Sequence, residues 1–586
     1  MIAQSALIVS TVALVAALVP VRASSWVAGL GLAVPPLLYA DALVLIRIDR
    51  HLPAVAALLM NAHADENRQL LEATGIDLRA LALFLVGIAA GVGAGVWFDR
   101  KLGDRSSDRT RPARRRLLCL AAVSLLATGA LEAESPHAVS SAAWARFARS
   151  VPQLLEAAGP TRRALASIRV ALRPPLAAPE TSRRMDAVVT PGDPPPGDVF
   201  FFVLESLRAD AVSPATTPAM WRVGEDGLRV DAAVSGGNVT QYGWYTLFTS
   251  RPALYWPPSP DDTAGAIALR IARARGWRIE VLTANDLSYM RLDETIFGAS
   301  RALADAWFDA GRDPVSPAER DDRVVRELSA RAAQPHPPAV FVVALDATHL
   351  PYTWASSFTP PFVPYAGPRH YIHVQTEASE RVAVANRYRD AVAYDDSLVA
   401  RFVAGLRDRG AYEDATIVLV GDHGEEFWEH GLVSHGSEPC GIQTHVPLVI
   451  KPSRALRAES DWSSPKPLAS GMDVWPTLLD AAGVRGDLGA LLMGSSLLRG
   501  PTSAAPSANQ RYWYRPGRFV IDDGRRKVEL ELRNPDDPFE MQEMDVLGFR
   551  DAEDAPTDGG LTASAYVSLL RERFGPSLDR FLVVQW

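Results

Sequence analysis

Two apolar runs of the sequence end on residues that can bind a metal. Residues 416–420 (Thr-Ile-Val-Leu-Val) predict a buried strand that stops at Gly421 and is followed by Asp422 and His423. A second run, residues 199–204, ends in the same way on Glu205. In open α/β sheets, ligands and catalytic groups gather beyond the carboxyl ends of the strands. These three side chains are therefore candidate metal ligands at one edge of a sheet.

Strand-like and helix-like segments alternate along the central part of the chain. The predicted strands are residues 199–204, 278–282, 339–345, 416–420 and 446–450, and the predicted helices are residues 217–226, 263–275, 322–332, 380–409 and 473–482. Such alternation indicates a mostly parallel sheet covered by helices on both faces. Residues 518–521 and 527–532 predict a small antiparallel addition near the C-terminus.

The first part of the chain has the pattern of a membrane domain. Four apolar runs, residues 3–20, 26–46, 80–98 and 117–131, have about the length that a bilayer core requires, and we expect four spanning helices. The loop at residues 100–116 carries eight Lys and Arg residues, which the positive-inside rule places in the cytoplasm. Everything after the fourth span is then extracytoplasmic. A fifth span and the side of the N-terminus stay open.

We divide the chain into four parts on these patterns. A transmembrane domain at residues 1–132 is followed by an extracytoplasmic linker at 133–197, a catalytic domain at 198–505 and a C-terminal subdomain at 506–586. The linker is rich in Ala, Arg and Pro. Its residues 143–158 are spaced like a short amphipathic helix, either on the membrane surface or packed as a linker helix. Residues 190–197 read as an extended spacer.

Charge and cysteine content exclude some classes of protein. The net charge of -8 and the pI near 5.8 argue against a nucleic-acid partner, whose phosphates would require a basic face. The chain has two cysteines, Cys119 and Cys440, so neither a disulfide framework nor a cluster of cysteine metal ligands is expected. Cys440 is predicted to be a loop thiol.

Thr240 is the best candidate for a nucleophile. It follows the sequence Gly-Gly-Asn-Val and precedes Gly243, which is a setting in which a helix N-terminus presents a hydroxyl to an anion. The alternative is an ordinary helix-capping threonine. A divalent cation would make the hydroxyl a useful nucleophile, because it favours the deprotonated oxygen. A set of carboxylate, imidazole and hydroxyl ligands suits one Zn or Mn ion.

Six motifs in order along the chain resemble a known family. They are Val-Leu-Glu-Ser-Leu-Arg-Ala-Asp at 203–210, Gly-Asn-Val-Thr at 237–240, Asp-Ala-Thr-His-Leu-Pro-Tyr at 346–352, Tyr-Arg-Asp-Ala-Val-Ala-Tyr-Asp at 388–395, Val-Gly-Asp-His-Gly-Glu-Glu at 420–426 and Asp-Val-Trp-Pro-Thr-Leu-Leu at 473–479. This set resembles the sulfatase-like branch of the alkaline phosphatase superfamily. Within that branch it is most similar to membrane-anchored phosphoglycerol transferases of the lipoteichoic-acid-synthase type and to phosphoethanolamine transferases.

The resemblance implies a role for each matching residue. It assigns Glu205, Thr240, Asp422 and His423 to the metal, and Thr240 also to the covalent nucleophile. His349 is expected at the substrate phosphate or the leaving-group oxygen. His430 and His435 both fall where the family places a further substrate-contacting histidine, and we favour His435. Asn238 is also expected to contact substrate. His445 is expected to have a structural role.

One departure from the family pattern narrows the expected reaction. True sulfatases need a Cys or Ser in a Cys/Ser-x-Pro-x-Arg motif, and neither cysteine here lies in one. The resemblance therefore implies a metal-dependent transferase in the cytoplasmic (inner) membrane. It would move a phospholipid headgroup, phosphoglycerol or phosphoethanolamine, to an envelope glycan or lipid through a phosphothreonine. The alternatives are a phosphodiesterase or sulfatase-type hydrolase, and an inactive lipid-binding regulator on the same fold.

Overall fold

The computed structural model describes most of the chain after residue 163. The described residues are 164–176, 178–188, 197–258, 263–368, 378–431, 433–457, 461–462, 468–484, 486–500, 502–512, 515–557 and 560–586. They belong to one compact unit, residues 162–371 and 376–586. The expected spans within residues 1–132 and the expected helix at 143–158 lie outside them. No helix among the described residues is long and apolar enough to cross a membrane.

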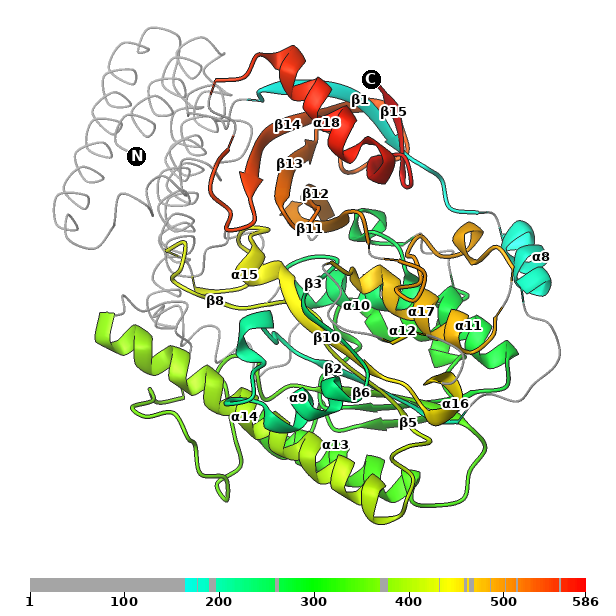
Figure 1. Ribbon diagram of the computed structural model, residues 1–586, viewed down its shortest axis with the longest axis vertical. Coiled ribbons are helices and arrows are strands. Elements are labelled where there is room, and N and C mark those ends of the chain that lie inside the picture. The colour runs from blue at the N-terminus through cyan, green and yellow to red at the C-terminus, as the bar shows by residue number, and fades with distance from the viewer. Residues whose placement is uncertain are drawn as a thin grey trace, which may run out of the picture. The chain divides into compact units, whose positions relative to one another are not determined.

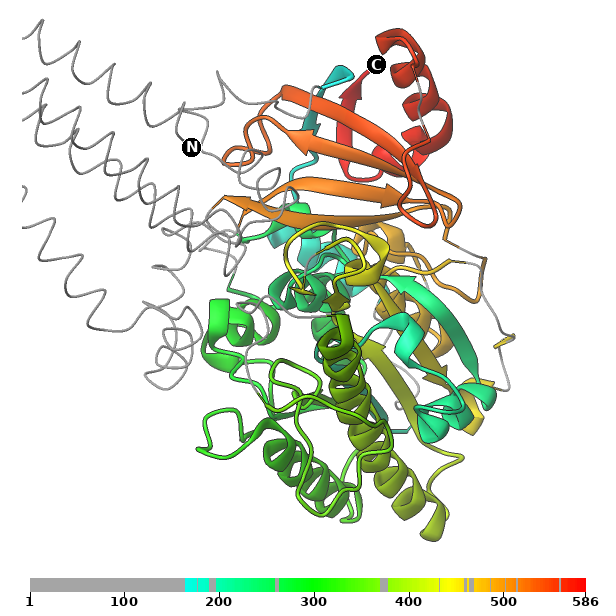
Figure 2. The same cartoon turned by 90° about the vertical axis from the view of Figure 1, so that its left-hand side faces the viewer.

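The larger of the two main sheets has seven strands in the order β3-β10-β7-β2-β6-β4-β5 (Figures 1 and 2). Its strands are β2 (Val199–Leu204), β3 (Leu228–Val234), β4 (Arg278–Thr283), β5 (Ala306–Asp309), β6 (Ala339–Leu345), β7 (Thr416–Gly421) and β10 (His445–Lys451). Strand β10 runs antiparallel to both of its neighbours, and the pairs β7·β2, β2·β6, β6·β4 and β4·β5 are parallel. The expectation of a mostly parallel α/β sheet is confirmed.

The central strands are buried on both faces, which explains their continuous apolar sequences. Every residue of β2, β6 and β7 is buried. Phe200 contacts Phe402 of helix α14 (Ala378–Asp408), with ring centroids 4.8 Å apart. Phe201 points to the opposite face and stacks on Trp475 of α17 (Val474–Ala481) at 5.8 Å. Because successive residues of a strand alternate between faces, one aromatic run anchors helices on both sides of the sheet.

Helices form a layer on each face of this sheet (Figure 1). One layer contains α9 (Pro218–Glu225), α13 (Pro317–Ala332) and α14, and the other contains α10 (Thr240–Thr249), α11 (Ile267–Ala274), α12 (Leu292–Phe297) and α17. Helix α13 begins with a complete capping box, in which the Ser316 side chain accepts from the Glu319 N–H and the Glu319 side chain accepts from the Ser316 N–H. This cap satisfies backbone groups that a helix start leaves unpaired.

The second main sheet is larger than the expected C-terminal addition. It has six antiparallel strands in the order β11-β12-β13-β14-β1-β15, with α18 (Ala563–Leu578) packed on it. The strands are β1 (Ala166–Leu172), β11 (Ala505–Tyr512), β12 (Arg515–Asp522), β13 (Arg526–Leu532), β14 (Gln542–Asp551) and β15 (Leu582–Gln585). Strand β1 comes from the range that we expected to be linker. Those residues instead complete the sheet by pairing with β14 and β15.

The two sheets meet beside the candidate nucleophile. The Ala508 N–H of β11 donates to the Gly236 carbonyl at 2.8 Å, and the Asn238 N–H donates to the Ala508 carbonyl at 3.3 Å. The loop before Thr240 is thus held by the C-terminal sheet as well as by its own domain.

Candidate active site

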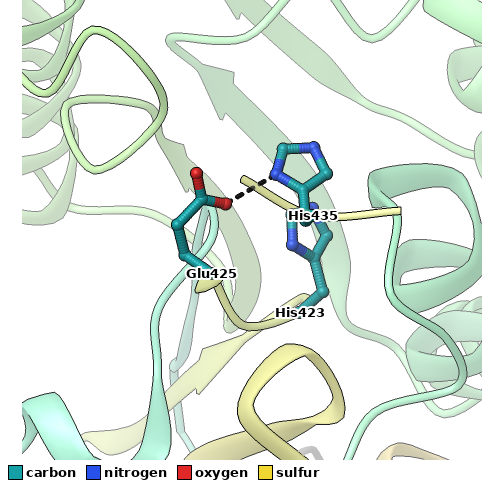
Figure 3. Close-up of side chains that lie close together, drawn as sticks. All are labelled: His423, Glu425 and His435. Carbon is teal, nitrogen blue, oxygen red and sulfur yellow. Dashed lines mark hydrogen bonds and ion pairs between the residues drawn. The ribbon is translucent and has the colours of Figure 1, made fainter. Parts of the chain in front are cut away.

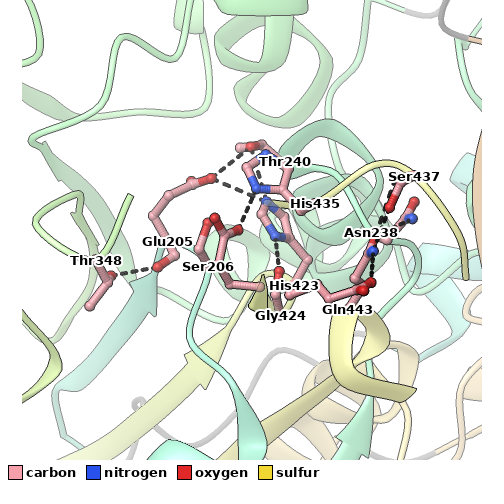
Figure 4. Close-up of polar contacts among 12 residues, drawn as sticks. Glu205, Ser206, Asn238, Thr240, Thr348, His423, Gly424, His435, Ser437 and Gln443 are labelled. Carbon is pink, nitrogen blue, oxygen red and sulfur yellow. Dashed lines mark hydrogen bonds and ion pairs between the residues drawn. The ribbon is translucent and has the colours of Figure 1, made fainter. Parts of the chain in front are cut away.

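The predicted metal ligands emerge side by side at one edge of the parallel sheet. Glu205 directly follows β2, and Asp422 and His423 directly follow β7. Strands β2 and β7 pair in parallel with Leu204 opposite Gly421, so the next residue of each strand leaves the sheet at the same level. The Glu205 Oε1 atom lies 3.2 Å from His423 Nε2, and all three side chains are buried. The structure therefore brings together the three residues predicted from the strand ends; Figure 4 shows two of them, Glu205 and His423.

Thr240 places its hydroxyl against this group from a different element. It is the first residue of α10, and its Oγ1 donates to Glu205 Oε1 at 2.8 Å and lies 3.4 Å from His423 Nε2. Thr240 is partly exposed, whereas Glu205, Asp422 and His423 are buried. A partly exposed residue whose hydroxyl contacts a buried ligand group can meet a substrate without opening the core.

Close packing at Gly243 sets the position of α10 relative to Asp422. A Cβ atom at Gly243 would lie 2.1 Å from the Asp422 carbonyl oxygen, which is backbone and cannot rotate away. We expect Gly243→Ala to lower the free energy of unfolding by about 1–3 kcal/mol, as overpacking does, and to reduce metal binding. Thermal unfolding and metal titration measure the two effects.

Gly405→Ala is the matched control for that substitution. Gly405 lies inside α14, where an added Cβ meets only the end of the Arg409 side chain at 3.6 Å. Alanine there should stabilise the helix by about 0.5–1 kcal/mol. Equal effects of the two substitutions would contradict the proposed close approach of α10 to Asp422.

The polar atoms at the site fit a divalent cation. Asp422 Oδ1 accepts from the N–H groups of Ser206 and His423 at 2.9 and 2.8 Å, while its buried Oδ2 has no hydrogen-bond partner among the described residues. His423 Nδ1 lies 2.9 Å from the Gly424 carbonyl, so Nε2 is the ring nitrogen that faces Glu205 and Thr240 and that would act as a ligand. A buried carboxylate oxygen without a partner is costly unless a cation is bound to it. Glu205, Asp422, His423 and Thr240 would hold that cation, and this mixture of N and O ligands suits Zn or Mn.

The charges of the site show why it needs a positive partner. Burial raises the pKa of the Asp422 carboxyl, and the charge of Glu205 raises it further. Burial by itself lowers the pKa of His423, but the charge of Asp422 and the hydrogen bond with Glu205 outweigh it and raise that pKa to about 10. Without a cation, a proton on His423 offsets part of the negative charge that is crowded at this site. A bound cation would take the place of that proton.

Asn285 is a site residue that sequence reasoning missed. It follows β4, and its Nδ2 donates to Glu205 Oε2 at 3.3 Å and to Asp346 Oδ1 at 3.1 Å. Thr348 holds the same glutamate by donating its hydroxyl to the Glu205 carbonyl. The available signal was that Asn285 lies just beyond the carboxyl end of a predicted strand, as Glu205 and Asp422 do.

His435 and His349 lie next to the ligand group. The rings of His435 and His423 are 4.2 Å apart between centroids, and those of His435 and His349 are 5.6 Å apart. His435 Nδ1 lies 2.7 Å from Glu425 Oε2 (Figure 3). Burial, together with the charge of His423, lowers the pKa of His435 to about 4, so its ring is neutral at pH 7. Tyr352 donates its hydroxyl to the other oxygen of Glu425 at 2.5 Å, which fixes the carboxylate.

The other two candidate residues, Asn238 and His445, form their hydrogen bonds with residues outside the ligand group. Asn238 is buried, and its Nδ2 donates to the Glu438 carbonyl at 3.0 Å and to Gln443 Oε1 at 2.9 Å, so it ties down a neighbouring loop. Its role as a substrate contact stays a prediction. His445 Nε2 lies 2.8 Å from Asp522 Oδ2, which fits the structural role expected for it.

Comparison with known proteins identifies the domain that carries this site. Residues 198–484 match the Sulfatase family. This family is part of the alkaline phosphatase superfamily, so residues 198–484 are similar to that superfamily. Proteins of the Sulfatase family depend on metals, and the site described here offers the ligands for one. No curated protein matches the chain.

Several solved structures are similar to the chain. The periplasmic domain of the phosphoethanolamine transferase EptC from Campylobacter jejuni matches with 17% identity and a TM-score of 0.41, over 51% of this chain and 94% of that one. The lipoteichoic acid synthase LtaP from Listeria monocytogenes matches with 13% identity and a TM-score of 0.46, over 69% and 98%. A phosphonate monoester hydrolase from Agrobacterium radiobacter matches with 17% identity and a TM-score of 0.45, over 65% and 94%.

Proposed function

We propose that the protein is a membrane-anchored, metal-dependent phosphotransferase that works on the extracytoplasmic face of the cytoplasmic membrane. It takes phosphoglycerol or phosphoethanolamine from a phospholipid and passes it to an envelope glycan or lipid. The observation that carries the proposal is the position of Thr240, a partly exposed residue at the N-terminus of α10 whose hydroxyl lies 2.8 Å from Glu205 Oε1. The apolar runs before residue 132 support the membrane location.

The proposed reaction has two half-reactions that share the same nucleophile. The Thr240 oxygen attacks the phosphorus of the donor, a new O–P bond forms, and the bond from phosphorus to the lipid alcohol oxygen breaks. The acceptor hydroxyl then attacks the phosphorus of the phosphothreonine: an O–P bond to the acceptor forms, the O–P bond to Thr240 breaks, and the proton of the acceptor hydroxyl passes to the Thr240 oxygen. A divalent cation held by Glu205, Asp422 and His423 would supply charge stabilisation and would favour the deprotonated Thr240 hydroxyl. The N-terminus of α10 favours the negative phosphate.

His349 is proposed to protonate the lipid alcohol as it leaves. A lipid alkoxide is a poor leaving group, so its departure needs a proton from a nearby donor. His349 follows β6 at the same edge of the sheet as Asp422, is half-buried and contacts the ring of His435. It is therefore close to the site without being in the ligand group.

We expect His349→Ala to keep its metal but to lose about 100-fold or more in rate on the phospholipid donor, the usual scale for a lost general acid. A p-nitrophenyl phosphodiester, whose leaving group needs no proton, should be affected much less. Initial rates on both substrates measure the difference. His336→Ala is the matched control, because His336 precedes β6 and lies at the opposite end of the same strand. Equal losses on both substrates would remove the acid role.

Product analysis separates the transferase from a hydrolase. The full-length protein is incubated with a phospholipid that carries a labelled headgroup, with and without a hydroxyl acceptor. The proposal predicts lipid alcohol together with label on the acceptor, and little release of label when the acceptor is absent. Release of free headgroup phosphate at the same rate without acceptor would identify a phosphodiesterase instead. No reaction and no label on the protein would point to a lipid-binding regulator.

A further inference from the structure

A second group of potential metal ligands follows directly after Glu425 in the sequence, at residues that the proposed reaction does not use. Glu425 and Glu426 are neighbours at the start of β8 (Glu426–Phe427), and their contacts lie in different directions. Glu425 contacts His435 and Tyr352 beside the catalytic group. Glu426 instead contacts Gln443, which donates to its Oε2 at 2.9 Å. Successive side chains of an extended chain point to opposite sides, so Glu425 and Glu426 contact different sets of residues.

His430 and Cys440 converge on the same carboxylate oxygen. Glu426 Oε2 lies 3.8 Å from His430 Nδ1 and 3.9 Å from Cys440 Sγ. One ligand atom of each residue lies within 4.8 Å of the others. Bonds of about 2.0–2.3 Å around a tetrahedral zinc place its ligand atoms roughly 3.3–3.7 Å apart. At the catalytic group, His423 Nε2 lies 3.2 Å from Glu205 Oε1 and 3.7 Å from Asp422 Oδ2. The two distances from Glu426 Oε2 in the second group, 3.8 and 3.9 Å, are therefore slightly longer than the longer of these two.

The surroundings of the three side chains favour a bound cation. The Glu426 carboxylate is held by the His430 N–H at 2.8 Å as well as by Gln443, and such hydrogen bonds orient ligands in metal sites. Cys440 is 4% exposed, while the His430 side chain is 35% exposed and offers a path from solvent. A thiol 3.9 Å from a carboxylate makes at most a weak hydrogen bond, whereas a cation would give all three side chains a common partner.

We propose that Glu426, His430 and Cys440 bind a second divalent cation, of the zinc type, in a structural site separate from the catalytic one. Sulfur, nitrogen and oxygen ligands together suit zinc, and water from the exposed side would complete its coordination. With two cysteines in the chain, a site built from several thiolates is not expected, but this mixed site requires the thiolate of a single cysteine, Cys440.

The position of this site gives it a structural role. A cation there would join the hairpin of β8 and β9 (Val433–Ser434) to the loop that leads into α15 (Gly441–Thr444). The Gln443 carbonyl in α15 accepts from the Gly424 N–H at 2.9 Å, next to His423. The proposed cation would thus brace the segment that carries a catalytic ligand, without contacting the substrate.

Cobalt spectroscopy of the full-length protein tests this proposal independently of the enzymatic activity. Co²⁺ bound to a thiolate gives a charge-transfer band in the near ultraviolet, and none of the catalytic ligands Glu205, Thr240, Asp422 and His423 contains sulfur. The chain has two cysteines, so Cys119→Ser is the matched control. We expect the band in the wild type and in Cys119→Ser, its loss in Cys440→Ser, and one metal ion fewer per chain in Cys440→Ser by elemental analysis.

A second variant, His430→Ala, tests the same site in case Cys440→Ser does not fold. His430→Ala changes a side chain on the exposed side of the site. Residues that only hydrogen-bond to metal ligands already contribute about 10–100-fold to metal affinity. Loss of the ligand His430 should therefore lower the affinity for Co²⁺ at least tenfold, as measured by titration of the band. A wild-type protein without the band, a band that persists in Cys440→Ser, or unchanged affinity in His430→Ala would overturn the assignment.

Discussion

Replacement of Thr240 by alanine is expected to reduce the rate of lipid alcohol release about 10⁴-fold or more, the scale on which enzymes lose activity with their nucleophile. The substitution removes the hydroxyl and the γ-methyl group of a partly exposed residue, so little core volume is lost and the domain should stay folded. Its midpoint of thermal unfolding should lie close to that of the wild type. Initial rates and unfolding are measured on the same full-length preparation.

Two further threonine variants make this result specific. Thr240→Ser retains a hydroxyl in the same place and should recover part of the rate. Thr249→Ala changes the last residue of the same helix, where the hydroxyl donates to the Tyr245 carbonyl, and should keep the wild-type rate. Wild-type rates in Thr240→Ala would rule out Thr240 as the nucleophile.

Replacement of Asp422 by asparagine is expected to remove the catalytic cation. The change is nearly isosteric, but it puts an amide in place of a carboxylate whose Oδ2 lies 3.7 Å from His423 Nε2. Because Glu205, Asp422 and His423 act as one unit, Glu205→Gln and His423→Gln should have the same effect. Mutation of a residue that only hydrogen-bonds to a metal ligand lowers metal affinity about 10–100-fold. Each of these ligand variants should lose at least that much affinity. Activity should fall with the metal.

The metal content is best measured in a Cys440→Ser background, where the proposed second site cannot contribute. Asp396→Asn is the matched control, since Asp396 is a buried carboxylate of α14 that accepts from the Ala219 and Met220 N–H groups, away from the ligands. It should destabilise the fold by about 1 kcal/mol and keep its metal. Full metal occupancy in all three ligand variants would contradict the site.

The strands that sequence reasoning placed well are those buried on both faces. Strands β2 and β6 match their predicted ranges because their apolar runs are uninterrupted. Strand β3, Leu-Arg-Val-Asp-Ala-Ala-Val, lies at the sheet edge, and its polar residues Arg229 and Asp231 interrupt the apolar run by which a buried strand is recognised. Strand β1 joins a sheet with residues more than 350 positions away, and no local pattern encodes such pairing.

Contacts between distant segments also limited what could be predicted about the site. Glu205, Asp422 and His423 could be placed together because each ends a predicted strand, and adjacent parallel strands end at one edge. Asn285 reaches Glu205 because β4 lies two strands from β2, an order that the sequence does not state. Likewise, the partner of His435 is Glu425, ten residues earlier, and their contact depends on the path of the hairpin between them.

Mass spectrometry of the Thr240 peptide tests the central claim most directly. The purified full-length protein is incubated with mixed phospholipids, quenched in acid and digested. The phosphotransferase account predicts an added mass on Thr240 that equals one phosphoglycerol or one phosphoethanolamine group, and none in the Asp422→Asn protein. An unmodified Thr240 peptide in a preparation that is releasing lipid alcohol would contradict the account.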